Sequence, residues 1–79
     1  MARYFFDIHD GREMRDNVGT ECATLEEAYQ HAREIIPEIA AHEIPASGDR
    51  QAYTVLVTDE QGRPVYTAAL SYLGLVLTR

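Results

Sequence analysis

The sequence contains a single cysteine, Cys22, and no lysine. One cysteine excludes a disulfide bond within the chain. Without lysine, the chain has no residue for a P-loop phosphate contact, a Schiff base or a lysine general base. All 7 basic residues are arginine. The absence of lysine therefore removes several classes of catalytic chemistry at once.

Long apolar runs are also missing. No run approaches the roughly 18 residues of a membrane-spanning helix. The N-terminus lacks the basic, apolar and small-residue order of a signal peptide. We therefore expect a cytoplasmic protein with no membrane partner, and the apolar residues 70–77 favour a short buried strand or helix segment.

Positive charge is scarce, and the formal net charge at pH 7 is −6. Non-specific affinity for nucleic acid needs clustered cations that neutralise phosphates. The arginines here are scattered, so no nucleic-acid partner is expected. A role as an antitoxin or regulator of nucleic acid would require the arginines to cluster after folding, or a basic protein partner.

The 79 residues predict one domain, residues 1–79, with a small core. At this size folding buries about 60% of the surface of the unfolded chain. Such a core rarely supplies more than ~3–5 kcal/mol of stability by itself, and oligomers often add to it.

Two segments read as a strand that runs into an Asp/Gly turn, which is typical of β-hairpins. They are residues 4–12 and 53–63. The first strand alternates, so Tyr4, Phe6 and Ile8 are predicted to face the core, and a short return strand is expected within residues 13–17. The second hairpin is expected to pair residues 52–58 with residues 63–69.

A helix is predicted between the hairpins. Thr24 and Glu27 fit a capping box at its start. Helical spacing then places an apolar stripe against the sheet, formed by Leu25, Ala28, Ala32, Ile35, Ile36 and Ile39. Pro37 predicts a kink or a second short helical piece. Pro45, Ser47 and Gly48 predict a loop.

The predicted fold class is α+β, an antiparallel sheet of two hairpins in the order ββαββ with one kinked helix on one face. The tail from residue 71 to 79 has two interpretations, because its leucines alternate like a fifth strand yet are also spaced like a helix face. One helix covers one face of a sheet. Four apolar residues are therefore expected to need a second cover and are the predicted interaction residues: Phe5, Leu56, Leu73 and Leu75.

Asp7, His9 and Asp10 form the strongest candidate for chemistry. Asp7 and His9 share a strand face, so they could bind a metal ion, or His9 could act as a base oriented by a carboxylate. The favoured interpretation is structural: a polar strand face runs into a turn whose amides Asp10 holds. No catalytic residue and no cofactor is assigned.

Other candidates also have structural interpretations. A row on the helix could hold a divalent ion between two copies of the chain, but a solvated helix face is favoured; the row is Glu27, His31, Glu34, Glu38 and His42. Cys22 precedes a helix start that could activate a thiol, but a buried structural role is favoured. Arg3, Arg12 and Arg15 could meet an anionic ligand, but pairing with the surplus carboxylates is favoured.

The opening R-Y-F-F-D-I-H-D-G at residues 3–11, together with residues 16–21, 25–28 and 57–62, resembles a family of short bacterial proteins. It is a domain-of-unknown-function family, common in rhizobia and other alphaproteobacteria. The resemblance implies a small cytoplasmic domain without an assigned activity. The leading hypothesis is a non-enzymatic protein-interaction module that forms a homodimer or binds another protein; the alternative is a metal-dependent or acid/base enzyme that uses Asp7, His9 and Asp10.

Overall fold

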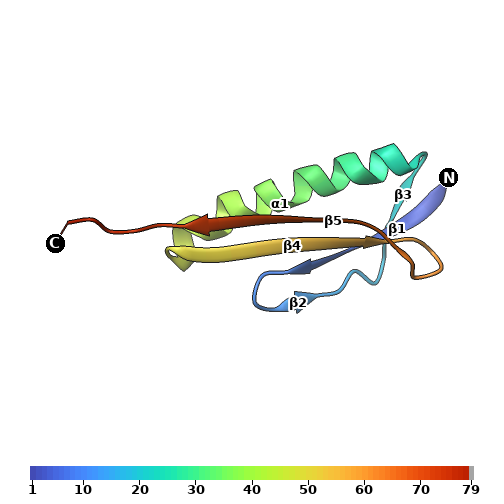
Figure 1. Ribbon diagram of the computed structural model, residues 1–79. Helices are drawn as coiled ribbons and strands as arrows, with labels where there is room; N and C mark the ends of the chain where they lie inside the picture. Colours follow the sequence, from blue (N-terminus) through green and yellow to red (C-terminus); the bar gives the residue numbers. More distant parts are fainter. Residues whose placement is uncertain (79) are drawn as a thin grey trace.

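The computed structural model describes residues 1–78, with the side chains of Ala46 and Ser47 excepted. It confirms the predicted α+β class, an antiparallel sheet with one helix packed on it (Figure 1). The elements follow in the order β1 (Ala2–His9), β2 (Glu13–Met14), β3 (Thr20–Cys22), α1 (Leu25–Ser47), β4 (Arg50–Thr58) and β5 (Pro64–Leu73).

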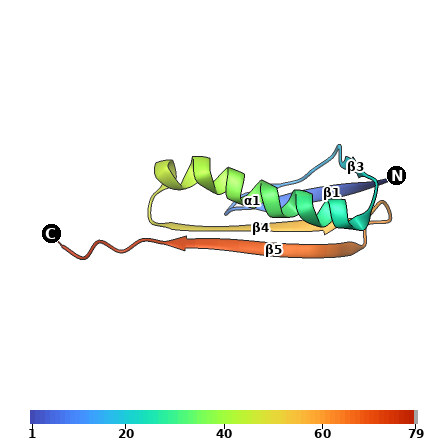
Figure 2. The same cartoon turned by 90° about the horizontal axis from the view of Figure 1, so that it is seen from above.

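The main strands have the order β2-β1-β4-β5, and every neighbouring pair is antiparallel. The outer edge of β1 is shared by two short strands, because β3 pairs with its first half and β2 with its end. At the other side of the sheet, β5 pairs with β4 and has no second neighbour within residues 1–78. Figure 2 shows β5 running along this side of the sheet.

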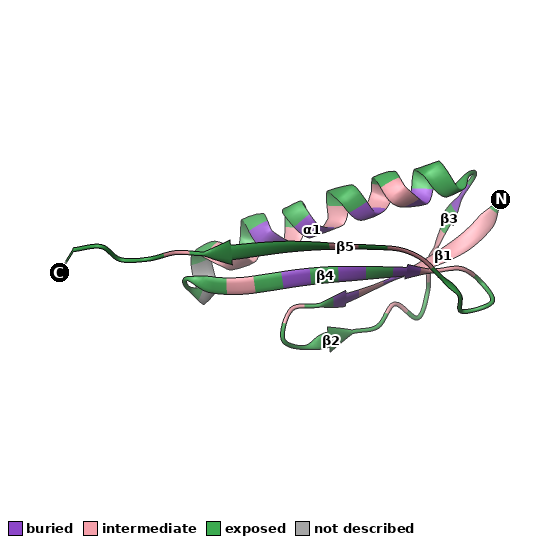
Figure 3. Cartoon of the chain, viewed as in Figure 1, coloured by how far each residue is buried: buried purple, intermediate pink, exposed green. Residues whose placement is uncertain are grey.

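The core lies between α1 and one face of the sheet. Tyr53, Val55 and Val57 point from β4 toward α1 and are fully buried, while the residues between them are exposed (Figure 3). Phe6 and Ile8 of β1 are buried beside them, as predicted. The helix contributes small residues, because its buried positions are Ala28, Ala32, Ile36 and Ala40. Alanine at these positions lets the helix approach the sheet closely.

The predicted helix start is confirmed. Thr24 is the N-cap, and its hydroxyl accepts a hydrogen bond from the Glu27 amide at 3.2 Å. The Glu27 carboxylate reaches back to the amide of Ala23 at 2.8 Å, one residue before the predicted amide of Thr24. Two otherwise unpaired backbone donors at the start of the chain's helix are thus satisfied.

The helix end differs from the prediction. Pro37 does not divide the helix, and the loop predicted from Pro45 is wrong because α1 continues to Ser47. Each proline removes one amide donor, but the turns around Pro37 remain packed on the sheet through Ile36 and Ala40. Gly48 ends the helix with a φ of 106°, a conformation that favours glycine.

The strands also depart from the predicted bounds. The return strand is shorter than residues 13–17, and the short strand β3 was not predicted. β5 continues past residue 69 to Leu73. Residues 74–78 then form neither helix nor strand, so both interpretations of the tail are wrong there, and the expected buried segment at residues 70–77 is wrong because Leu75, Val76 and Leu77 are exposed. The Gly74 amide donates to the Asp49 carbonyl at 2.8 Å. Within residues 1–78, no helix is both long and apolar enough to cross a membrane.

Candidate functional site

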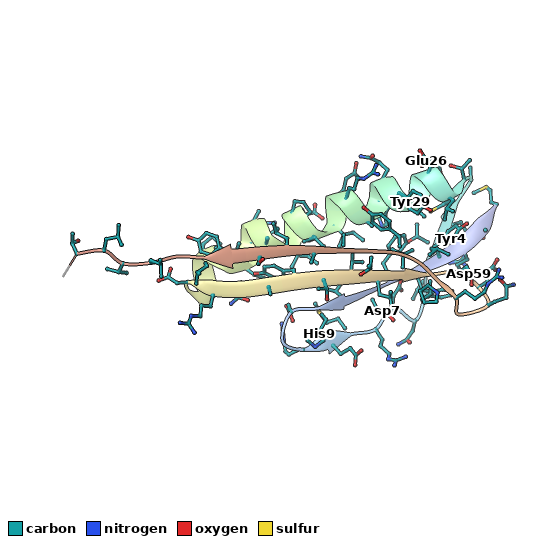
Figure 4. All side chains as sticks on the ribbon, in the orientation of Figure 1. Tyr4, Asp7, His9, Glu26, Tyr29 and Asp59 are labelled. Carbon is teal, nitrogen blue, oxygen red and sulfur yellow. The ribbon has the colours of Figure 1, made fainter. Side chains whose placement is uncertain are left out.

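Asp7 and His9 lie on the face of the sheet that α1 does not cover (Figure 4). Residues opposite one another in an antiparallel pair share a face. Asp7 is opposite Leu56, and His9 is opposite Thr54. The predicted alternation of β1 is therefore confirmed, with the aromatic and aliphatic core residues on one side and the candidate polar residues on the other.

The Asp7 carboxylate is engaged within the chain. It accepts a hydrogen bond from the Asp16 amide at 2.9 Å. The Asp16 carboxylate in turn accepts from the amides of Phe6, Val18 and Gly19 at 3.1, 3.1 and 2.9 Å. These contacts, which we term the Asp16 clasp, tie the loop of residues 15–19 to β1. Asp7 thus has a structural role in this fold.

The Asp16 carboxyl keeps its negative charge to a lower pH than an ordinary aspartate does. Partial burial would raise the pKa of this carboxyl, but the amides of Gly19, Phe6 and Val18 and the nearby Arg3 guanidinium outweigh it and lower the pKa. A carboxylate that accepts several backbone amides is stabilised in its charged form. The clasp therefore depends on the negative charge of Asp16.

Asp10 holds the first turn, as its favoured interpretation predicts. Its side chain is 2% exposed and lies 3.6 Å from the Arg12 guanidinium, and it accepts from the Arg12 amide at 3.2 Å. Burial would raise the pKa of Asp10, but the Arg12 amide, the interaction with the neighbouring Glu43 carboxyl and the Arg12 charge lower it. His9 is exposed. Across residues 1–78, no three His, Cys, Asp or Glu side chains gather as a metal-binding group.

The structure adds a polar cluster that the sequence did not indicate. The Tyr53 hydroxyl is buried and has no hydrogen-bond partner within the described part of the chain. Burial raises the pKa of this hydroxyl, and the charges of Glu43 and Asp10 raise it further. Asp10 is in the first turn, Glu43 is near the end of α1 and Tyr53 is in β4. No short-range sequence signal links positions so far apart.

The row of Glu and His residues on α1, predicted as a possible divalent-ion site, does not form one site. Glu27 caps the helix, and Glu34 accepts from the Gln30 side chain at 3.2 Å. The His31 ring packs edge-on against Phe6 with ring centroids 4.7 Å apart, so this histidine is part of the packing. Glu38 and His42 are exposed, in keeping with a solvated helix face.

Cys22 is buried, as predicted, and lines a hollow of about 270 Å³ with His31, Glu27 and Glu34. Burial raises the pKa of its thiol, and the Glu27 charge raises it further. The reactive form of cysteine is the thiolate. A neutral thiol at this position favours the structural role.

Of the three candidate arginines, Arg3 and Arg12 pair with carboxylates, as expected, while no ion pair of Arg15 is found within residues 1–78. Arg3 lies 3.2 Å from Glu21, across the pairing of β1 with β3. Arg12 lies beside Asp10. Exposed pairs of this kind contribute about 0.2–1 kcal/mol.

The four predicted interaction residues fall into two groups. Phe5 and Leu56 lie on the open sheet face, where Leu56 is 40% exposed. Leu73 ends β5 and Leu75 follows it, with exposures of 65% and 73%. Thr67, the β5 residue opposite Leu56, lies roughly 20 Å before Leu73 at about 3.4 Å per residue. The groups are therefore separate surfaces.

The second group belongs to a larger feature, the open edge, which we define as β5 together with residues 74–78. This stretch, residues 64–78, contains no charged residue. Val76 and Leu77 are 81% and 89% exposed, and the tail projects past the end of the sheet (Figure 1). The absence of charge is readable in the sequence, but its position along a sheet edge is not.

An apolar hollow of about 190 Å³ lies next to the open edge. It is lined by α1 residues on one side and by β5 residues on the other. The lining residues are Ala32, Arg33, Ile36, Pro37, Ala68, Ala69 and Leu70. The apolar surface of the edge thus continues toward the helix.

A family model described as a domain of unknown function, DUF6894, matches residues 3–71. The chain therefore belongs to the DUF6894 family. A search of curated proteins and a search of solved structures each gave no match. The family match agrees with the predicted resemblance to a family without an assigned activity, while the bacterial group implied by the opening motif stays a prediction.

Proposed function

We propose that this chain is a non-enzymatic protein-interaction module that acts as a cytoplasmic homodimer. The observation that carries the proposal is the open edge, a long edge strand without charge that continues into an exposed apolar tail. Unpaired strand edges are templates for pairing with another chain. Monomeric proteins usually protect them with charges, bulges or very short strands.

The open edge has little of this protection. Pro64 stands at its very beginning, and the irregularity in its pairing with β4 lies near the same end, between Val57 and Thr58. From Val65 to Leu73 four residues are of types that favour β-structure: Val65, Tyr66, Thr67 and Tyr72. The remainder of the edge is therefore available for a partner strand.

The acidic character of the chain supports the same site. With a net charge of −6, two copies repel each other over most surfaces. The open edge is a stretch where two copies can meet without opposing carboxylates. Leu73 and Leu75 would lie at this contact, while Phe5 and Leu56 would remain on the open sheet face as a surface for a protein partner.

The alternative function, a metal-dependent or acid/base enzyme, has less support. The Asp7 carboxylate accepts a hydrogen bond from the Asp16 amide, and the Asp10 carboxylate accepts one from the Arg12 amide. Both carboxylates therefore have structural roles. His9 shares the open sheet face with Asp7, whereas Asp10 lies beside Glu43 of α1. A divalent metal retained through purification, and lost in His9→Ala while that variant stays folded, would favour the enzyme over the interaction module.

The first prediction concerns the mass in solution. The wild-type chain should have a mass near twice its 8.9 kDa by light scattering after size exclusion, with monomer appearing on dilution. Leu75→Asp should raise the dissociation constant at least about tenfold, because it places a charge within the paired edge. The exposed tail should leave the fold of this variant unchanged.

Val18→Asp is the matched control, because Val18 is 76% exposed in a loop outside the open edge. It makes the same type of charge change and should remain dimeric. A wild-type chain that stays monomeric at high concentration would count against the homodimer. Dissociation by both variants would show that added negative charge acts generally, and not through the edge.

A further inference from the structure

We infer that the open edge pairs antiparallel with the open edge of a second copy, with Ser71 at the two-fold axis and residues 74–78 completing the strand. This inference rests on the proposed homodimer and specifies its geometry. Two copies would form one continuous sheet with both helices on the same face. Residues 74–78, which project from one chain, would then form a strand that pairs with β5 of the second copy.

The backbone directions permit this pairing. The Gly74 amide donates to Asp49, which precedes β4, so residue 74 directs its polar groups toward β4. Residues two apart in a strand direct these groups to the same side. Odd-numbered residues, including Ala69, Ser71 and Leu73, therefore direct their amides and carbonyls outward. In an antiparallel pair around Ser71, odd-numbered residues meet odd-numbered residues and can exchange hydrogen bonds.

The length of the uncharged stretch indicates the register. In the sequence, Arg63 precedes the uncharged stretch and Arg79 follows it. Ser71 is the midpoint of residues 64–78. Pairing around this midpoint aligns the uncharged stretch with itself over its full length, and it brings Arg63 of each copy level with Arg79 of the other at the two ends of the paired segment. The register around Ser71 therefore gives the longest charge-free pairing.

The side chains are complementary in this register. On the open sheet face, Leu73 would lie opposite Ala69 of the second copy, and Leu75 opposite its Thr67. Large residues thus meet smaller ones. On the helix face, Tyr72 would lie opposite Leu70 of the second copy. Leu70 lines the apolar hollow of about 190 Å³, so the tyrosine ring of one chain would cover the hollow of the other.

The same geometry accounts for the exposed tail. Residues 74–78 would pair with residues 64–68 of the second copy. Leu75, Val76 and Leu77, which are 73%, 81% and 89% exposed in the single chain, would gain strand neighbours. Burial of apolar surface of this kind is the main driving force for association.

Cysteine cross-linking tests the register. In a Cys22→Ala background, Ser71→Cys should form a disulfide-linked dimer under mild oxidation. Directly opposed hydrogen-bonded residues have Cα atoms about 5.5 Å apart, within the range of about 4.4–6.8 Å that a disulfide spans. Ala69→Cys and Leu73→Cys should not cross-link alone, because each position lies roughly 13 Å from its own copy.

Mixed chains provide the second measurement. Ala69→Cys chains combined with Leu73→Cys chains should cross-link to each other, because position 69 is opposite position 73 of the second copy. A dimeric mass by light scattering without these cross-links, or with cross-linking of Ala69→Cys or Leu73→Cys alone, would overturn this geometry and leave the homodimer in place. A monomeric mass at every concentration would overturn both.

Discussion

At the scale of single residues, the Asp16 clasp concentrates several backbone hydrogen bonds on one carboxylate. The Asp16 carboxylate accepts hydrogen bonds from three backbone amides, and the backbone amide of Asp16 donates a hydrogen bond to the Asp7 carboxylate. The neighbouring Gly19 has a φ of 80°, and a Cβ there would lie 2.7 Å from the Arg3 side chain. The loop of residues 15–19 is therefore fixed by specific residues and not by apolar burial.

Asp16→Asn should lower the free energy of unfolding at pH 7 by about 1–2 kcal/mol, because the amide groups lose a charged acceptor. The folded chain lowers the pKa of Asp16 below its ordinary value of 3.8. The stabilisation is thus complete above pH 3.8 and is lost as the pH falls through the folded value. Urea unfolding at several pH values measures both effects.

Glu60→Gln is the control for this prediction, because Glu60 is exposed in the second turn. This substitution removes one negative charge, as Asp16→Asn does. It should change the stability by less than about 0.5 kcal/mol. The difference between the two variants should shrink at low pH. A difference that stays constant from pH 7 to pH 2 would show that the charge of Asp16 is not what the clasp requires.

Residues whose roles are local in the chain could be predicted from the sequence. The turn role of Asp10 follows from its place before Gly11, and the cap role of Thr24 follows from the glutamate three positions later. The role of Asp7 could not be predicted in this way, because its partner Asp16 comes from a loop beyond the turn. The cluster of Asp10, Glu43 and Tyr53 depends on three separate elements and has no local pattern.

At the scale of elements, the stability of α1 depends on the hydrogen bonds at its N-terminus. Thr24→Ala should lower the free energy of unfolding by about 1 kcal/mol, because the Glu27 amide loses its acceptor. Thr24→Ser keeps a hydroxyl at the same position and should retain most of the stability. Thermal and denaturant unfolding compare the three chains. Equal losses in both variants would assign the effect to packing of the threonine methyl group.

The elements were predictable where periodicity and turn residues agree. Alternation marked β1, and strand segments that run into Asp/Gly turns marked both hairpins. The helix end was not predictable, because proline near the last turn is unfavourable in general but tolerated at Pro45. The short strand β3 carries too few residues for a pattern, and its pairing with the start of β1 is a long-range contact.

At the scale of the whole molecule, one helix covers one face of a sheet, as the sequence predicted. The strand order was not predictable, because hairpin signals do not show which strand of each hairpin lies in the centre. The order β2-β1-β4-β5 places β1 and β4 together and leaves β5 outside. That order converts an uncharged stretch of sequence into an accessible edge.

The proposed dimer should become stronger as salt is added. Two chains of net charge −6 repel each other at a distance, while the contact itself carries no charge. The screening length falls from about 30 Å at 0.01 M salt to about 10 Å at 0.1 M. The dissociation constant should fall at least about threefold over this range. Sedimentation in sodium chloride measures it, with a neutral solute of equal osmolality as the control.

A dissociation constant that rises with salt would instead indicate ion pairs across the contact. Such a result would oppose a dimer built on uncharged strands and would direct attention to Arg12 and Arg50 as contact residues. Both arginines are exposed near the first turn and the start of β4.

The two sides of the sheet differ in a way that would limit the size of the proposed assembly. The side opposite β5 ends in strands of 2 and 3 residues, separated by the loop that Asp16 holds. Strands this short offer little backbone to a further chain. A two-fold contact between β5 strands uses the same patch on both chains and closes on itself. Growth into fibres would require a second side that pairs with another chain, so the short strands and the Asp16 clasp would limit the proposed complex to two copies.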